Sequence, residues 1–179
     1  TTTKELISAV LSEGMNVLYT EGNLNNHIGV PLTLLRIRPE HDIAVIETGA
    51  NHPGEITLLS NIVQADFGLI TNVGRAHLEG FGSFEGVKQT KGELYDDLYK
   101  RGKQIFLNTS DEDLVQMAIG RGFVLGKDAL PYIEGVVDAV TPFVEMKWRP
   151  ANVQPLRTTT TNLVGSYNIA NLCAAVTIG

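Results

Sequence analysis

Short apolar runs alternate along this chain with stretches of helical periodicity, and this alternation restricts the possible fold more than any other feature. Residues 43–46 and 67–72 are continuous or nearly continuous apolar runs, as expected for strands that are buried on both faces of a parallel sheet. Residues 54–63 have a helical period, and Ser83 is placed to cap a long helix that ends near Lys100. The order strand, helix, strand, helix predicts an α/β fold with a mostly parallel sheet flanked by helices.

The two ends of the chain extend this pattern, but one segment departs from it. Between residues 132 and 162 the sequence changes to short β-rich stretches separated by prolines, which predicts a small antiparallel flap or edge. An opening helix carries Leu6, Ile7, Val10 and Leu11 on one face. The other elements predicted by the same periodicities are strands at 16–20 and 104–108 and helices at 28–37, 111–119 and 166–178.

The composition excludes several classes of function. The chain has 179 residues, which suits one domain with a proper core, and a formal net charge of −6 from 14 basic and 20 acidic residues. A protein that binds nucleic acid or an anionic membrane surface usually has a basic excess, so we expect neither partner. No apolar run approaches the roughly 18 residues that span a bilayer. Because Cys173 is the one cysteine, no internal disulfide can form, and a reducing cytoplasm is the expected location.

Candidate catalytic residues lie where the predicted strands end. In open α/β sheets, ligands bind beyond the carboxyl ends of the strands. Glu47 directly follows the run 43–46 and begins a Gly-rich turn, so its carboxylate is a candidate Mg²⁺ ligand; the alternative is a turn carboxylate that binds local amides. His77 follows the next strand, and Lys91 lies in the helix after it. Taken alone, each of these two is more typical of a solvated side chain.

Two groups of asparagines are candidate ligand contacts. Asn23, Asn25 and Asn26 lie in one polar loop, where they could hold substrate or phosphate through amide hydrogen bonds or serve as turn residues. Asn168 and Asn171 lie close together in the last predicted helix and project from one face. They could hydrogen-bond a nucleotide, or Asn168 could cap the helix. The residues alone leave these alternatives open.

Five segments, taken in order, resemble the central ATP-binding domain of the Mur ligases, a family that attaches amino acids to the peptidoglycan precursor. The resemblance extends from Thr1 to Gly179 and is strongest to the ligases that add D-alanyl-D-alanine. Because the segments occur at the family's spacing, the combination is far more specific than any one of them. The segments are GNLNNHIGVP at 22–31, IETGANHPGEI at 46–56, AHLEGFG at 76–82, KGEL at 91–94 and GSYNIAN at 165–171.

The resemblance implies a site that holds two Mg²⁺ ions. Thr1 is similar to the hydroxyl residue that ends the family's phosphate-binding loop and ligates Mg²⁺, and Glu47 is similar to the metal-binding glutamate. His77 matches the histidine of the second metal. Lys91 matches a lysine that many Mur ligases carbamylate, a reaction that converts an ammonium group into a carboxylate-like Mg²⁺ ligand. His77 and Lys91 are therefore the catalytic residues that the resemblance implies.

The resemblance also implies ATP as the nucleotide. Asn168 and Asn171 correspond to a pair that contacts it, although Tyr167 stands where the family commonly has histidine. The strand, glycines and lysine of the phosphate-binding loop would precede Thr1, and the domains that hold the UDP-sugar and close over ATP would lie outside this chain. We therefore expect residues 1–179 to be a segment of a larger enzyme, inactive by itself.

The implied activity is ATP-dependent amide ligation in the bacterial cytoplasm. A carboxylate of UDP-MurNAc-tripeptide would take the γ-phosphoryl group of ATP, and the amine of D-Ala-D-Ala would displace phosphate from the acyl phosphate. Another Mur ligase or a folylpolyglutamate-type ligase, with a different amine, is the alternative within this class. A non-catalytic scaffold that keeps the fold is the alternative from another class, and the retention of Glu47, His77 and Lys91 speaks against it.

Overall fold

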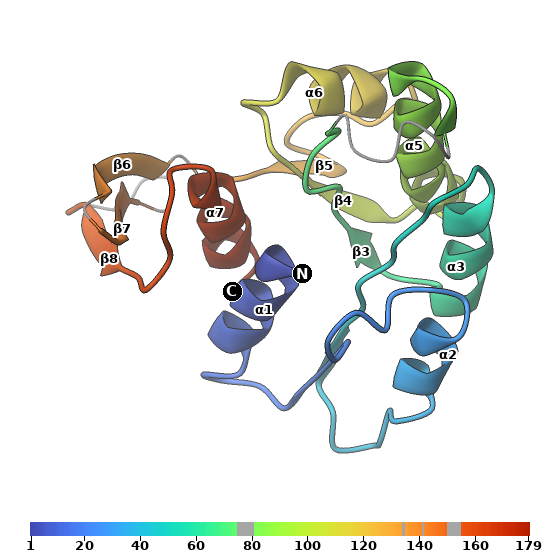
Figure 1. Cartoon of the computed structure of the whole chain (residues 1–179), viewed down its shortest axis with the longest axis horizontal. Coiled ribbons are helices and arrows are strands. Elements are labelled where there is room, and N and C mark those ends of the chain that lie inside the picture. Colours follow the sequence, from blue (N-terminus) through green and yellow to red (C-terminus); the bar gives the residue numbers. More distant parts are fainter. Residues whose placement is uncertain (75–80, 134, 141, 150–154) are drawn as a thin grey trace.

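Helices and strands alternate through most of the chain (Figure 1). The computed structural model describes residues 1–74, 81–133, 135–140, 142–149 and 155–179. The helices are α1 (Thr2–Leu11), α2 (Gly29–Leu34), α3 (Glu55–Val63), α5 (Phe84–Lys100), α6 (Glu112–Ile119) and α7 (Asn168–Ile178). The strands are β1 (Val17–Tyr19), β2 (Ile43–Val45), β3 (Phe67–Gly68), β4 (Gln104–Leu107), β5 (Ala129–Pro131), β6 (Gly135–Val140), β7 (Val144–Trp148) and β8 (Arg157–Thr160).

Strand pairing is parallel from β1 to β5. β1 pairs with β2, and β3, β4 and β5 form a second sheet in that order. Helix α1 packs on β1 and β2, and α5 packs on β3 and β4. The predicted α/β fold, with mostly parallel strands flanked by helices, is therefore confirmed, although the described strands divide the parallel part into two sheets.

The two parallel sheets contribute to one apolar cluster. Ile43 and Val45 of β2 pack against buried side chains of α1 and α7, and so does Leu69, which directly follows β3. Figure 1 shows α1 and α7 side by side, with the two chain ends close to them. The carboxyl ends of β2 and β3 thus both pack against α1 and α7.

The expectation that residues 43–46 and 67–72 are buried on both faces is wrong. Ala44 is exposed, and Phe67 at the start of β3 is 50% exposed. Alternate residues of a strand point to opposite sides of the sheet. In β2, Ile43 and Val45 therefore pack against α1 and α7, whereas Ala44 points to the other side and is exposed. Two predicted elements are also shorter than expected: β3 ends at Gly68, and the helix predicted at 28–37 is α2, which ends at Leu34.

Two helix starts were predicted correctly from local signals. The hydroxyl of Ser83 accepts a hydrogen bond from the amide nitrogen of Gly86 over 3.0 Å and so caps α5. A carboxylate oxygen of Asp111 accepts one from the amide nitrogen of Leu114 over 3.2 Å and caps α6. The cap at Ser83 is the predicted one, whereas at 111–119 a helix was predicted without its cap.

The β-rich segment forms a separate antiparallel sheet in the order β6-β7-β8, as the prediction of a flap requires. This sheet packs on α7 through a cluster that includes Val144, Met146 and Cys173. Cys173 is thus a buried core residue, and burial raises the pKa of its thiol. Within the described ranges, no helix has the length and apolar character needed to cross a membrane.

Candidate functional site

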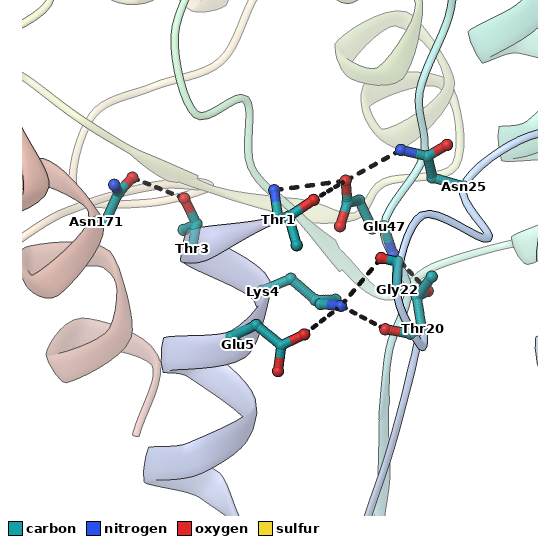
Figure 2. Close-up of polar contacts among 9 residues, drawn as sticks. All are labelled: Thr1, Thr3, Lys4, Glu5, Thr20, Gly22, Asn25, Glu47 and Asn171. Atoms are coloured by element: carbon teal, nitrogen blue, oxygen red, sulfur yellow. Dashed lines mark hydrogen bonds and ion pairs between the residues drawn. The ribbon is translucent and has the colours of Figure 1, made fainter. Parts of the chain in front are cut away.

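Thr1 and Glu47 meet where α1 begins and β2 has just ended (Figure 2). Thr1 is the N-cap of α1, and its hydroxyl donates to Glu47 Oε1 over 3.1 Å. The first N–H groups of a helix have no partners within the helix, so they can bind anions. A hydroxyl and a carboxylate at this position are suited to hold a cation beside phosphate oxygens.

The loop after β1 holds Glu47 in place. Nδ2 of Asn25 donates to Glu47 Oε1 over 3.0 Å, and the amide nitrogen of Glu47 donates to the hydroxyl of Thr20 over 2.9 Å. The side chain of Thr20 is fully buried. Because the loop makes hydrogen bonds with both the backbone and the carboxylate of Glu47, the position of this residue relative to α1 is well defined.

One oxygen of Glu47 is left without a protein partner. Oε2 is buried and has no hydrogen bond. A buried polar atom without a partner is unfavourable unless it accepts a hydrogen bond or binds a cation. Carboxylate oxygens are suitable ligands for Mg²⁺. In the described part of the chain, no three His, Cys, Asp or Glu side chains gather into a ready metal cluster. The arrangement fits a Mg²⁺ ion that takes few ligands from protein and the others from phosphate and water.

Lys91, on α5, is not the solvated helix lysine of the alternative interpretation. Its side chain is partly buried, and its Nζ donates to the backbone carbonyl of Asn72, beyond the end of β3, over 2.6 Å. Burial lowers the pKa of Lys91, while Asp111 acts in the opposite direction by favouring the charged form. Lys91 therefore reaches a strand end with an amine that loses its proton more readily than an exposed lysine does.

His77 lies outside the described residues, so its predicted place beside a second metal stays a prediction. Lys91 and Glu47 are both described, and no hydrogen bond or ion pair joins them. The predicted convergence of Lys91, Glu47 and His77 on one crevice is therefore also still a prediction.

The three asparagines of the loop at 22–27 differ in their contacts. Asn25 binds Glu47, as described above. Oδ1 of Asn26 accepts from two amide nitrogens at the start of α2, over 3.0 and 2.9 Å, so the turn interpretation holds for this side chain. Asn23 is exposed, and its carbonyl accepts from the amide nitrogen of Asn25 over 2.7 Å. Contact with substrate stays a prediction for all three.

Asn168 and Asn171 bind each other and α1. Nδ2 of Asn171 donates to Oδ1 of Asn168 over 2.9 Å. The hydroxyl of Thr3 donates to Oδ1 of Asn171 over 2.7 Å (Figure 2). The N-cap of α7 is Tyr167, so the alternative that Asn168 caps the helix is wrong. Asn168 is buried and Asn171 is partly exposed, which leaves Asn171 as the member that a nucleotide could reach.

Sequence reasoning missed a buried cation next to this site. Lys4 is 5% exposed, and its Nζ donates to the backbone carbonyl of Thr20 over 2.5 Å. The signal was available, because Lys4 precedes Ile7 and Leu11 at helical spacing and so belongs to the buried face of α1.

Glu93 was missed as well, and no local signal could have found it. Its carboxylate accepts from the amide nitrogens of Gly54 and Thr57 over 2.7 and 2.8 Å, and so caps α3 from α5. The partners lie more than thirty residues earlier in the sequence, and only the fold brings them together.

Comparisons with known proteins place the chain in a family. Residues 1–179 match the family described as Mur ligase middle domain. The UDP-N-acetylmuramoyl-tripeptide–D-alanyl-D-alanine ligase of Escherichia coli (strain K12) is 50% identical over 113 residues, 63% of this chain and 25% of that protein. The protein of the same name from Buchnera aphidicola subsp. Baizongia pistaciae is 34% identical over 184 residues, 99% of this chain and 39% of that protein.

Solved structures agree with the family match. A crystal structure of MurF from Acinetobacter baumannii has a TM-score of 0.85 at 31% identity, and the match covers 99% of this chain and 39% of that one. MurF from Thermotoga maritima in complex with ADP has a TM-score of 0.77 at 25% identity, and the match covers 98% of this chain and 41% of that one. The chain thus spans well under half the length of the proteins that it matches. Because the family match covers every residue and the fold agrees, the chain belongs to the Mur ligase family and corresponds to its middle domain.

Proposed function

We propose that this chain is the nucleotide-binding part of an ATP-dependent ligase that joins D-Ala-D-Ala to UDP-MurNAc-tripeptide. The observation that carries the proposal is the Thr1–Glu47 pair at the start of α1, with one carboxylate oxygen buried and unpartnered. The substrates come from the names of the relatives, and the nucleotide is supported by the ADP complex of the T. maritima protein.

The proposed reaction has two steps. The terminal carboxylate of the tripeptide attacks the γ-phosphorus of ATP, and ADP leaves as an acyl phosphate forms. The amine of D-Ala-D-Ala then attacks the acyl carbon, and phosphate leaves as the amide bond forms. Both steps depend mainly on positioning and on neutralising phosphate charge, and bound Mg²⁺ supplies much of that positive charge.

The residues of this chain would bind and orient the reactants. Thr1 and Glu47 would hold one ion beside the β- and γ-phosphates, where N–H groups at the start of α1 face the anion. His77 and Lys91 would hold a second ion beside the substrate carboxylate. Asn171 would contact the nucleotide from α7, supported by its bond to buried Asn168.

Lys91 would serve as a carbamate. Its neutral amine adds to CO₂, an N–C bond forms, and one proton leaves to solvent, so that an ammonium group is replaced by a carboxylate-like anion. The lowered pKa of Lys91 supports this role, because only the neutral amine reacts. The loop that carries Asn23, Asn25 and Asn26 would lie on the side of the substrate.

We also propose that a strand and a phosphate-binding loop precede Thr1 and that further domains bind the UDP-sugar and close over ATP. The greater length of the relatives supports this. Within the described strands, β2 and β3 each pair on one side only, and both adjoin the apolar cluster beneath α1, the helix that such a strand would enter. The bacterial cytoplasm is the location that we propose for the whole enzyme.

Phosphate release by the full-length protein tests the proposal. The assay supplies ATP, Mg²⁺, UDP-MurNAc-tripeptide and a panel of amino acids and dipeptides. Release that requires D-Ala-D-Ala is the expected result, and release with a different amine would indicate another ligase of the class. A protein that neither releases phosphate nor binds ATP would be the non-catalytic scaffold. For residues 1–179 alone we expect no turnover and a Kd for ATP of about 1 mM or weaker, because the phosphate-binding loop that we propose before Thr1 would supply the main phosphate contacts.

A further inference from the structure

Lys4 is a cation buried beside the Thr1–Glu47 pair (Figure 2). Its side chain is 4% exposed and extends from α1 toward the loop after β1. Nζ donates to the carbonyl of Thr20 over 2.5 Å, lies 3.5 Å from the carbonyl of Gly22, and pairs with a carboxylate oxygen of Glu5 at 2.7 Å. An ammonium group has three N–H donors, so these partners use all of them. Lys4 is therefore not available to bind a ligand itself.

Thr20 connects Lys4 to Glu47. Its carbonyl accepts from Lys4, while its hydroxyl accepts from the amide nitrogen of Glu47 over 2.9 Å. Its own amide nitrogen donates to the carbonyl of Val45 over 3.1 Å, which continues the pairing of β1 with β2. A single buried residue thus holds the backbone of Glu47 on one side and is held by α1 on the other.

The same loop reaches Glu47 a second time, at the carboxylate. Asn25 donates to Oε1, and the carbonyl of Asn25 accepts from the amide nitrogen of Gly49 over 2.8 Å. A Cβ atom at Gly49 would lie 3.0 to 3.2 Å from the side-chain amide atoms of Asn25, so the loop and the turn after Glu47 are in close contact. Movement at Thr20 or Gly22 would therefore shift both contacts to Glu47.

A purely stabilising role does not explain a charge at this position. The other buried face positions of α1 include Ile7 and Leu11, and an apolar residue packed there commonly stabilises a protein as well as a buried ion pair does. An ammonium group that binds backbone carbonyls fixes the loop in one direction and at one distance, which apolar contact does not do. The position of Lys4 one turn after Thr1 places that anchor on the helix that begins the site.

We propose that Lys4 is a positioning residue for the Mg²⁺ and nucleotide site. By anchoring residues 20–25 to α1, it sets the position of Glu47 relative to Thr1. This inference rests on the proposed function for its effect on ligand binding, whereas the anchor itself is a property of the protein alone.

The test uses the full-length protein and the variants Lys4→Met, Thr20→Val and Lys103→Met. Lys4→Met removes the ammonium group at similar length, and Thr20→Val removes only the hydroxyl. Lys103 is the matched control, because it pairs with Asp66 at 2.6 Å next to the start of β4, away from the described site. The first measurement, made without ligand, is hydrogen exchange at the amides of Glu47 and Gly49. The second is the Mg²⁺ concentration that gives half-maximal ATP binding.

We expect exchange at both amides to become about tenfold faster in Lys4→Met. The Mg²⁺ requirement should rise about tenfold in Lys4→Met and in Thr20→Val, the range in which outer contacts of metal ligands act. Lys103→Met should match the unchanged protein in both measurements. Unchanged exchange and unchanged Mg²⁺ requirement in a folded Lys4→Met protein would overturn the proposal.

Thr20→Val decides the matter if Lys4→Met does not fold. It keeps the contact with Lys4 and breaks the next link, so an unaltered Mg²⁺ requirement in this variant would equally overturn the proposal. If the unchanged protein showed no Mg²⁺-dependent ATP binding, the proposed function would fail. The exchange measurement would still confirm or refute the anchor in that case.

Discussion

Two regions of this chain are held together by different kinds of contact. Around Glu47 the contacts are polar, and they join a hydroxyl, an ammonium group, amides and a carboxylate from α1 and two loops. Between α5, α6 and β4 the buried cluster is apolar, and Tyr95, Leu98, Ile105 and Leu114 are each 0% exposed. Hydrogen bonds fix direction and distance, whereas apolar burial supplies free energy without direction. We therefore infer that the first region sets geometry for a ligand and the second supplies stability.

Helix α5 carries both polar and apolar contacts. Leu98 and Tyr95 of this helix belong to the apolar cluster, while Lys91 and Glu93, further toward its start, contact the polar strand ends and turns. Changes in the apolar cluster should alter the free energy of unfolding, and changes around Glu47 should alter ligand binding. Substitutions on α5 should affect both the free energy of unfolding and ligand binding.

Truncation in the apolar cluster should have the largest effect. Leu98→Ala removes a fully buried side chain, and we expect the free energy of unfolding to fall by about 2–5 kcal/mol. Ile119→Ala is the control, because Ile119 is 56% exposed and should change stability by only about 0.5 kcal/mol. Urea unfolding of the full-length protein measures both values. A Leu98→Ala protein as stable as the control would show that this region is not the main source of stability.

Removal of the charge at Glu47 should come next in size and act on the ligand instead. In Glu47→Gln the side-chain oxygen can still accept from Thr1 and Asn25, but the anionic ligand for Mg²⁺ is lost. We expect Mg²⁺-dependent phosphate release to fall about 100-fold, equivalent to about 2.7 kcal/mol, with a change of under about 1 kcal/mol in unfolding. Phosphate-release kinetics and urea unfolding check the two values. Near-normal turnover would make Glu47 the turn carboxylate of the alternative interpretation.

A smaller effect is expected at Glu93, on α5. Glu93→Ala deprives the start of α3 of a cap that accepts from Gly54 and Thr57, so we expect a loss of about 1–2 kcal/mol in stability. Glu85→Ala, at an exposed position in the first turn of α5, is the matched control and should cost about 0.5 kcal/mol. Thermal unfolding of both variants tests the difference. Equal losses would mean that Glu93 acts only as a surface charge.

The order of elements could be predicted from the sequence because its signals are local. The predicted cap at Ser83 acts over three residues, and the strand and helix periods are read within each element. Burial of the strands could not be predicted, because exposure of Ala44 depends on which face distant helices cover. A short apolar run does not indicate which of its faces will be buried by helices from other parts of the sequence.

The candidate site could be predicted in part. Family motifs point to Thr1 and Glu47, and the structure joins them across 46 positions of sequence. The residues that hold Glu47 were assigned differently or missed: Asn25 was a candidate substrate contact, and Thr20 and Lys4 were not considered. Their partners lie on separate elements, so no spacing within one motif reveals them. Sequence therefore indicates ligands better than it indicates the residues that position them.

The last and smallest expected effect is a pH shift at Lys91, caused by the partial burial of its side chain on α5. Lys91 is partly buried on the helix whose later turns build the apolar cluster, and burial disfavours its charged form. Its pKa lies below that of an exposed lysine, so the neutral amine is populated at lower pH. Since the neutral amine is the form that adds CO₂, carbamate should increase as pH rises and should already form at a pH where exposed lysines remain protonated.

Lys88 offers a matched control three positions earlier on the same helix. Its ion pair with Asp113, at 2.5 Å, raises the pKa of Lys88 and keeps it charged, so it should not form the adduct. With ¹³C-labelled bicarbonate, the full-length protein should show a carbamate signal by NMR that Lys91→Arg removes and Lys88→Arg retains. The pH at which this signal is half-maximal should lie below that for carbamate on a lysine in an unfolded peptide. A signal that followed the peptide's pH dependence would show that burial does not tune this amine, and a signal that survived Lys91→Arg would show that the carbamate is not on Lys91.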